Sequence, residues 1–313
     1  MKNLLDPQMV FVTGKGGVGK TTVALALGLE AAASGRRTIV CEVGEQRRAP
    51  GLLGVPTGGD GEEVAVADGL WATSISPERA LRAWLAVQLG SRALTQALTR
   101  SGAFRYFAAA APGVDELVTM TKVWELTRAE RWDRRRRGTP YDLVVVDAPA
   151  SGHGLAMLAA PATFARVARV GPIAGQARAV AAFLRDPARV AYAAVTLAAE
   201  LPVTETLELA AALRGDLGRR LDAVVANQVL PRRFTRAEVA AVGAAGHAGA
   251  AHAVRSHAGA VAAQRAQLRR LRGGVDDGVP VATLPFVVRE ALDGDDVRAF
   301  GRRLAGAGPG AAG

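Results

Sequence analysis

Cysteine is almost absent from this chain. Its 313 residues include one cysteine, Cys41, which excludes a disulfide framework, a redox pair and a thiolate zinc site formed within one chain. No uninterrupted apolar run approaches the roughly 20 residues of a membrane-spanning helix. The opening residues, MKNLLDPQMVFV, are too short in apolar length for a signal peptide. We therefore expect a cytoplasmic protein.

Aromatic residues and lysine are also scarce. Aromatics make up 5% of the chain and much of its apolar half is alanine, which favours closely spaced helices over an aromatic β-sandwich. The net charge of +10 would suit a nucleic-acid partner, but the arginines are spread along the whole chain. Only four of the 39 basic residues are lysines, and two of these, Lys15 and Lys20, lie in one loop. A lysine in such an arginine-rich chain indicates a need for a compact ammonium group.

The order of the expected elements predicts a doubly wound α/β fold, with a mostly parallel sheet flanked by helices. Buried strands are expected at 9–13, 38–41, 70–75, 141–147, 192–197, 223–227 and 280–284. Helices are expected at 21–33 and 77–89, and a surface loop at 51–69. We expect residues 1–313 to form a single domain, with a helical subdomain from roughly 77–137 and 160–191.

A glycine-rich loop follows the first expected strand. Residues 14–21, GKGGVGKT, fit the pattern G-x4-G-K-[ST] and lie between a strand and a helix, as a phosphate-binding loop requires. Glycines allow successive backbone N–H groups to surround phosphate oxygens. The Lys20 ammonium can reach the β- and γ-phosphates of a nucleotide, and the Thr21 hydroxyl can bind Mg²⁺. The candidate nucleotide-binding residues of this loop are Gly14, Gly16, Gly17, Val18, Gly19, Lys20, Thr21 and Thr22.

Lys15, at the second position of the loop, is not expected to point into the same phosphate site as Lys20, because two ammonium groups would compete there. Loops that read KGGVGK resemble the deviant Walker A class of ATPases. In that class this lysine reaches across a dimer interface to the nucleotide on the facing subunit. The resemblance implies a dimer and a monomer that is catalytically incomplete.

Later segments resemble, in order, those of the ArsA and guided-entry tail-anchored-protein ATPase family. These segments are PGVDE at 112–116, APASGHGL at 148–155 after Asp147, Glu205-Thr206, Asn227-Gln228 and the stretch from Leu284-Pro285 to Arg289-Glu290. The resemblance covers residues 9 to about 305. It implies ATP and Mg²⁺ as cofactors and ATP hydrolysis as the reaction. It also implies that Asp147, with Thr21, binds the metal and that Asn227 and Pro285 face the adenine.

One segment departs from the family pattern. The family has Asp-Pro-Ala-His-Asn after the second strand, where the Asp positions the attacking water, and this chain has CEVGEQ at 41–46. Glu42 falls nearest that position and Glu45 is the second candidate. The candidate catalytic residues are therefore Lys15, Glu42, Glu45 and Asp147. Because a misplacement of about 1 Å can cost roughly 10²-fold in rate, we expect ATP binding but leave hydrolysis by the isolated chain open.

The metal-dependent properties of the family are not expected here. One cysteine supplies neither a Cys-x-x-Cys zinc site nor a thiolate cluster for arsenite. His247, His252 and His257 are spaced by five residues, so they do not share one face of a helix. We therefore expect no zinc.

Three functional hypotheses remain. The first is an ATP-driven switch that forms a homodimer, or a heterodimer with a paralogous ATPase, and acts on an unknown client or membrane partner. The second is a ParA- or MinD-like positioning ATPase that binds DNA or membrane, although nucleic acid is not the expected partner. The third is a weakly hydrolysing regulatory subunit that pairs with a paralogous ATPase.

Overall fold

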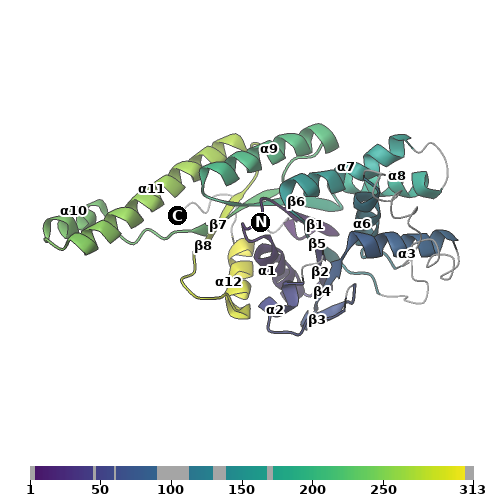
Figure 1. Cartoon of the computed structure of the whole chain (residues 1–313), viewed down its shortest axis with the longest axis horizontal. Coiled ribbons are helices and arrows are strands. Elements are labelled where there is room, and N and C mark those ends of the chain that lie inside the picture. The colour runs from purple at the N-terminus through teal and green to yellow at the C-terminus, as the bar shows by residue number, and fades with distance from the viewer. Residues whose placement is uncertain are drawn as a thin grey trace.

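A single eight-stranded sheet runs through the middle of the protein (Figure 1). The computed structural model describes residues 4–44, 47–59, 61–89, 113–129, 139–167 and 172–306. The strand order is β3-β4-β2-β5-β1-β6-β7-β8, and every neighbouring pair is parallel except β3 with β4. The strands are β1 (Met9–Thr13), β2 (Thr38–Val43), β3 (Val64–Ala67), β4 (Leu70–Ile75), β5 (Leu143–Asp147), β6 (Val190–Leu197), β7 (Ala223–Val229) and β8 (Val281–Pro285). The predicted doubly wound α/β fold is confirmed.

Helices cover both faces of this sheet. Those described are α1 (Lys20–Ala33), α2 (Ala49–Leu52), α3 (Pro77–Leu89), α6 (Val114–Glu125), α7 (Ser151–Val167), α8 (Pro172–Arg185), α9 (Glu200–Leu217), α10 (Arg236–Ala244), α11 (Ala248–Gly274) and α12 (Gly294–Gly306). Side chains alternate between the two faces of a strand. Met9 and Phe11 therefore join the core with α3, α6, α7, α8 and α9, whereas Val10 and Val12 join the core with α1, α2 and α12.

The last helix packs directly on the helix that follows the glycine-rich loop. Val297, Phe300 and Leu304 of α12 are buried in the same core as α1. At Gly301 a Cβ atom would lie 2.6 Å from the carbonyl oxygen of Ala26, so the close approach of the two helices requires glycine at this position.

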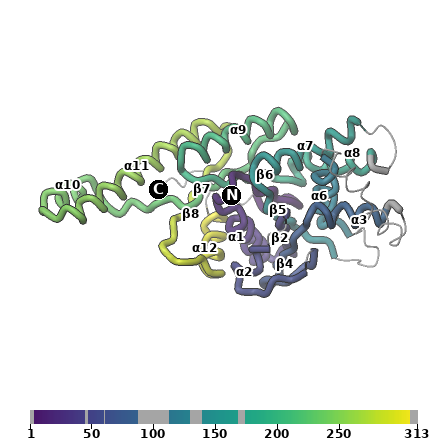
Figure 2. Tube along the Cα trace, in the orientation of Figure 1, coloured from purple at the N-terminus to yellow at the C-terminus, as the bar shows by residue number. Residues whose placement is uncertain are grey.

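Helices α10 and α11 form a hairpin that projects beyond the β8 side of the sheet (Figure 2). The 27-residue helix α11 begins at the projecting end and returns along α9 to the body of the molecule. No side chain of α10 is buried, whereas Leu268 and Leu271 near the end of α11 are buried. Of the buried residues of α11, Leu268 and Leu271 are the ones that join the core clusters of the body, so the hairpin is anchored there at its base.

Several sequence-based boundaries were wrong, and β2 and β7 each end two residues later than expected. Residues 51–69 were expected to be a loop but contain β3, a four-residue edge strand that pairs antiparallel with β4. The helical stretch expected at 160–191 ends earlier, because a turn at Asp186–Arg189 leads into β6 at Val190. The strand expected from Tyr141 begins at Leu143. The parts of the predicted helical subdomain at 90–112, 130–137 and 168–171 lie outside the described residues.

Candidate functional site

The glycine-rich loop lies at the carboxyl end of β1, between that strand and the N-terminus of α1. Gly14 has a φ of +144°, and a Cβ there would lie 2.1 Å from the Val195 carbonyl oxygen of β6. Gly19, the N-cap of α1, has a φ of +94°, and its Cβ would lie 2.3 Å from Asn227 Nδ2. At Gly16 and Gly17 a Cβ would meet nothing within 4 Å. Neighbouring strands thus crowd the two ends of the loop, while its crest is open in front of the positive end of α1.

Lys20, Thr21 and Asp147 meet beneath this loop. The register of β1 and β5 places Asp147 beside Val12, and the Thr21 hydroxyl donates a 2.5 Å hydrogen bond to Asp147 Oδ2. Lys20 Nζ donates to the Lys15 carbonyl oxygen at 3.0 Å, so its ammonium group curls back into the loop. Thr22, the next residue of α1, is partly exposed.

Burial shifts both ionisable groups of this cluster toward neutrality. Burial lowers the pKa of Lys20, although the Asp147 carboxylate opposes that shift. Burial also raises the pKa of Asp147, against the Thr21 hydrogen bond and the nearby charges of Lys20 and Arg48. Burying a lysine and a carboxylate costs desolvation free energy. Two such groups side by side therefore indicate a site for a charged ligand.

The donor set suits magnesium. A hydroxyl and a carboxylate oxygen, Thr21 Oγ1 and Asp147 Oδ2, are already within hydrogen-bonding distance of one another. Mg²⁺ is held in nucleotide sites by one or two such oxygens together with phosphate oxygens and water. Among the described residues there is no group of three or more His, Cys, Asp or Glu side chains that could hold a metal without a nucleotide.

Glu42 lies next to Asp147, but its carboxylate is already engaged. The two residues are register partners on β2 and β5. Glu42 Oε1 accepts from the Arg48 amide at 2.9 Å and Oε2 accepts from the Ala49 amide at 3.0 Å, which caps the start of α2. Burial raises the pKa of Glu42 to about 6, and the two amides oppose that shift. Glu45, the second candidate for orienting water, lies outside the described residues.

Lys15 pairs with a residue that the sequence did not assign to the site. Its ammonium group lies 2.6 Å from Glu205 Oε1, on the second turn of α9. Both side chains are about one-third exposed, at 35% and 29%. Glu205 belongs to the Glu-Thr pair that resembles the family, but nothing in the sequence indicated that it would contact a lysine 190 positions away.

Asn227 fastens the loop to the neighbouring strand. Asn227 Nδ2 donates to the Val18 carbonyl oxygen at 2.9 Å, and its Oδ1 accepts from the amide of Gln228. Gln228 has a φ of +54°, the one positive value among described residues other than glycine. Pro285 ends β8 beside Val229, two residues beyond Asn227 along β7. These residues form the rim of the site on the β7–β8 side.

Comparison with known proteins places the glycine-rich loop within a match to an ATPase family. The family model for anion-transporting ATPases, ArsA_ATPase, matches residues 7–171, more than half of the chain. The chain belongs to the ArsA ATPase family. The matched segment contains the phosphate loop, Glu42 and Asp147, while Glu205, Asn227 and Pro285 follow it. The family resemblance inferred from the sequence is thereby confirmed.

Three relatives show how far the ArsA family similarity extends. ATPase BagA of Mycobacterium tuberculosis is 31% identical over 233 residues, 73% of this chain and 67% of the relative. A putative arsenical pump-driving ATPase of Halobacterium salinarum is 26% identical over 237 residues, 73% of this chain and 36% of the relative. ATPase GET3 of Kluyveromyces lactis is 25% identical over 178 residues, 52% of this chain and 50% of the relative. In the part of this ArsA-family chain that the structure describes, no helix has the length and apolar content needed to cross a bilayer.

Proposed function

We propose that the chain is an ATP-driven switch that works as a dimer and uses Lys15 in trans. The observation that carries this proposal is the opposite orientation of two lysines in one loop. Lys20 turns into the loop, whereas the Lys15 ammonium group lies at the surface against Glu205. A lysine on the rim of a phosphate site, held by a partly exposed ion pair, can be released to a facing subunit at small cost.

In this proposal the loop holds the triphosphate of ATP. The backbone amides of Gly14 to Gly19 surround phosphate oxygens, and Lys20 exchanges the Lys15 carbonyl oxygen for the β- and γ-phosphates. Thr21 and Asp147 would hold Mg²⁺, and the ion would supply positive charge that neutralises the phosphates. Asn227, which already bonds to the loop, and Pro285 lie on the side where the adenine binds.

Hydrolysis then depends on a carboxylate that can orient water. Glu42 can serve only if its carboxylate leaves the amides of Arg48 and Ala49, which would uncap α2. With a pKa of about 6 it is mostly ionised at neutral pH, so once released it can accept a hydrogen bond from the attacking water. Glu45 is the alternative. Closure of the dimer would therefore be coupled to movement of the segment between β2 and α2.

The test compares wild type, Lys20→Ala and Lys15→Ala. Steady-state ATPase activity, nucleotide affinity and oligomer mass are measured with and without ATP and Mg²⁺. Lys20→Ala should lose nucleotide binding because its charge-assisted contacts to phosphate are gone. Lys15→Ala should retain most of the nucleotide affinity but lose ATP-dependent dimerisation and turnover. If Lys15→Ala dimerises and hydrolyses like wild type, the role in trans is wrong.

A second candidate is a weakly hydrolysing regulatory subunit paired with a paralogous ATPase. The engagement of both Glu42 carboxylate oxygens in capping α2 favours it. This function predicts that the purified chain binds ATP without turnover and that adding the paralogue restores activity. Turnover by the homodimer at a rate unchanged by the paralogue would exclude it.

A further inference from the structure

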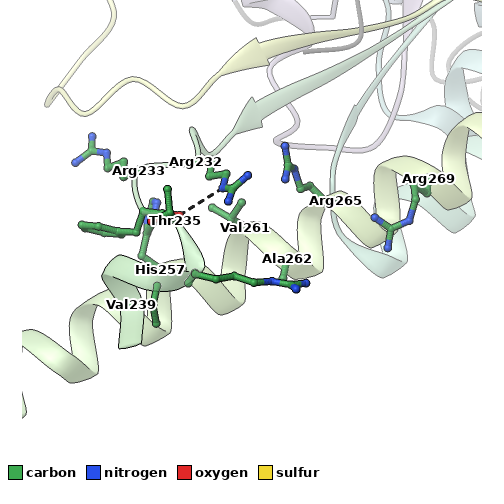
Figure 3. Close-up of a pocket in the computed structure, with 12 residues that line it drawn as sticks. Arg232, Arg233, Thr235, Val239, His257, Val261, Ala262, Arg265 and Arg269 are labelled. Atoms are coloured by element: carbon green, nitrogen blue, oxygen red, sulfur yellow. Dashed lines mark hydrogen bonds between the residues drawn. The ribbon is translucent and has the colours of Figure 1, made fainter. Parts of the chain in front are cut away.

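The base of the α10–α11 hairpin contains an open cavity of about 790 Å³. It lies between α11 and the segment that joins β7 to α10 (Figure 3). Five arginines contribute to its wall, together with apolar side chains such as Phe234, Val239 and Val261. These arginines are Arg232, Arg233, Arg236, Arg265 and Arg269. In Figure 3, Arg232 and Arg265 lie on the same side of α11, and Arg233 points outward.

The hairpin also concentrates the charge of the whole chain. Residues 230–275 contain eight arginines and one glutamate, a net +7 of the chain's +10. That glutamate, Glu238, closes a capping box with Thr235, and its carboxylate accepts from the Thr235 amide at 2.7 Å and the Thr235 hydroxyl at 2.8 Å. The single acidic group is therefore used within α10.

Among the described residues, none of the five cavity arginines forms an ion pair. Arg232 donates a hydrogen bond to the Phe234 carbonyl oxygen, but neither Arg265 nor Arg269 has a hydrogen bond to any described residue. Several guanidinium groups in one hollow repel one another unless an anion lies between them. Guanidinium groups bind phosphate oxygens through pairs of parallel hydrogen bonds.

The wall of the cavity is held in place without a ligand. His257 Nε2 lies 3.0 Å from the Pro231 carbonyl oxygen, and the Phe234 ring packs edge-on against the His257 ring. Further along α11, Gln264 accepts from the Leu230 amide at 2.8 Å and donates to the Gln228 carbonyl oxygen. The segment from 228 to 235 is thus fastened to α11 at two places. A preformed site loses less entropy when it binds.

The distribution of the cations favours a compact ligand. The projecting end of the hairpin, residues 237–254, contains no lysine or arginine and is mostly alanine and glycine. A long nucleic-acid backbone would be expected to contact positively charged side chains along this projecting end. Membrane binding would be expected to use large apolar side chains at this end of the hairpin. The largest apolar residue there is valine. The charges instead gather in the hollow at the base.

A second cavity of about 490 Å³ continues the first toward the nucleotide site. The two share Arg232, Val261, Arg265 and Arg269, and the second reaches Pro285 and adds Arg272 and Arg303. The basic hollow therefore extends to the β7–β8 rim of the site but excludes the phosphate loop itself. We propose that this hollow binds an oligophosphate, a compact ligand with two or more linked phosphate groups, at a site separate from the phosphate loop.

The experiment titrates inorganic tripolyphosphate into the Lys20→Ala variant, which weakens binding at the phosphate loop, and follows the heat of binding. One site per chain is expected. Arg265→Ala and Arg269→Ala should each weaken binding about tenfold, the effect of losing one charge-assisted contact. Arg255→Ala is the matched control, because Arg255 is exposed on the same helix but does not line the cavity. Arg265 and Arg269 are exposed, so unchanged circular dichroism is expected.

Four results would overturn the proposal. The first is a complete absence of tripolyphosphate binding, and the second is an equal loss in Arg255→Ala, which would indicate diffuse charge. The third is a DNA duplex that binds more tightly than tripolyphosphate at the same salt concentration, which would favour nucleic acid. The fourth is binding to phosphatidylglycerol vesicles without binding to tripolyphosphate, which would favour a membrane surface.

Discussion

The carboxylate of Glu42 is subject to two opposing influences. Its burial beside Asp147 favours the neutral acid, whereas the amides of Arg48 and Ala49 favour the anion. Burial has the larger effect, so the pKa lies above the ordinary value of 4.5, at about 6. Protonation of this group therefore stabilises the folded chain, and that stabilisation is lost as the pH rises through 6.

Glu42→Gln should remove this pH dependence. Between about pH 4.5 and pH 7 the folded wild type binds more protons at this position than the unfolded chain. The free energy of unfolding of wild type relative to the variant should therefore fall by about 2 kcal/mol over that interval. Urea denaturation at several pH values measures this difference.

Glu238→Gln provides the control for that measurement. Glu238 also caps a helix, but it is exposed, and its hydrogen bonds to Thr235 lower its pKa. Its stabilisation is lost only as the pH falls below the ordinary value of 4.5, so no fall is expected between pH 4.5 and pH 7. Parallel curves for wild type and Glu42→Gln would contradict the raised pKa of Glu42.

At the scale of the elements, the close crossing of α1 and α12 depends on Gly301. A methyl group on Gly301 would meet the Ala26 carbonyl oxygen at 2.6 Å and push the helices apart. Gly301→Ala should lower the free energy of unfolding by about 1–3 kcal/mol, the usual cost of overpacking. Gly259→Ala, in the middle of α11 with nothing within 4 Å, should instead raise it by about 0.5–1 kcal/mol. Thermal and chemical unfolding of the pair checks both signs, and a stabilising Gly301→Ala would contradict the crossing.

The sequence predicted best the helices and strands whose first and last residues are marked by local signals, such as a proline at the start of a helix. Residues 9–13 and 70–75 are strands at the expected boundaries, and 77–89 is a helix that begins at its proline as expected. The edge strand β3 was missed because its four residues lie among glycines and acids and are held by pairing with β4. The start of β6 was missed because alanine-rich sequence fits a helix as well as a buried strand.

At the scale of the whole molecule, long-range contacts set the details of the site. The loop, Thr21 and Asp147 could be predicted because a local motif and a strand end specify them. The partners of Lys15 and Glu42 could not, because they depend on how α9 and α2 pack against the carboxyl edge of the sheet. No local pattern indicates that Glu205 meets Lys15 or that the Arg48 and Ala49 amides meet Glu42.

Glu205→Gln should make dimerisation easier if the Lys15–Glu205 ion pair holds the lysine within its own chain. Because the pair is partly exposed, freeing Lys15 from it should cost about 0.5–1 kcal/mol per subunit. Without this cost, half-maximal dimerisation should need a roughly twofold to fivefold lower ATP concentration. Light scattering or mass photometry across an ATP series measures this midpoint.

Glu208→Gln is the control, because Glu208 is exposed on the same helix and has no ion pair among the described residues. It should leave the midpoint unchanged. A higher midpoint in Glu205→Gln would show that Glu205 supports the dimer instead of restraining Lys15.

The packing of α12 on α1 also bears on how the chain folds as it leaves the ribosome. Helix α1 is complete by Ala33, but the helix that covers it begins at Gly294. Most of the polypeptide must therefore emerge before the core between α1, the sheet and α12 is complete. During that interval the side of α1 that faces α12 stays uncovered, and nascent chains should acquire nucleotide affinity only in the final stage of synthesis.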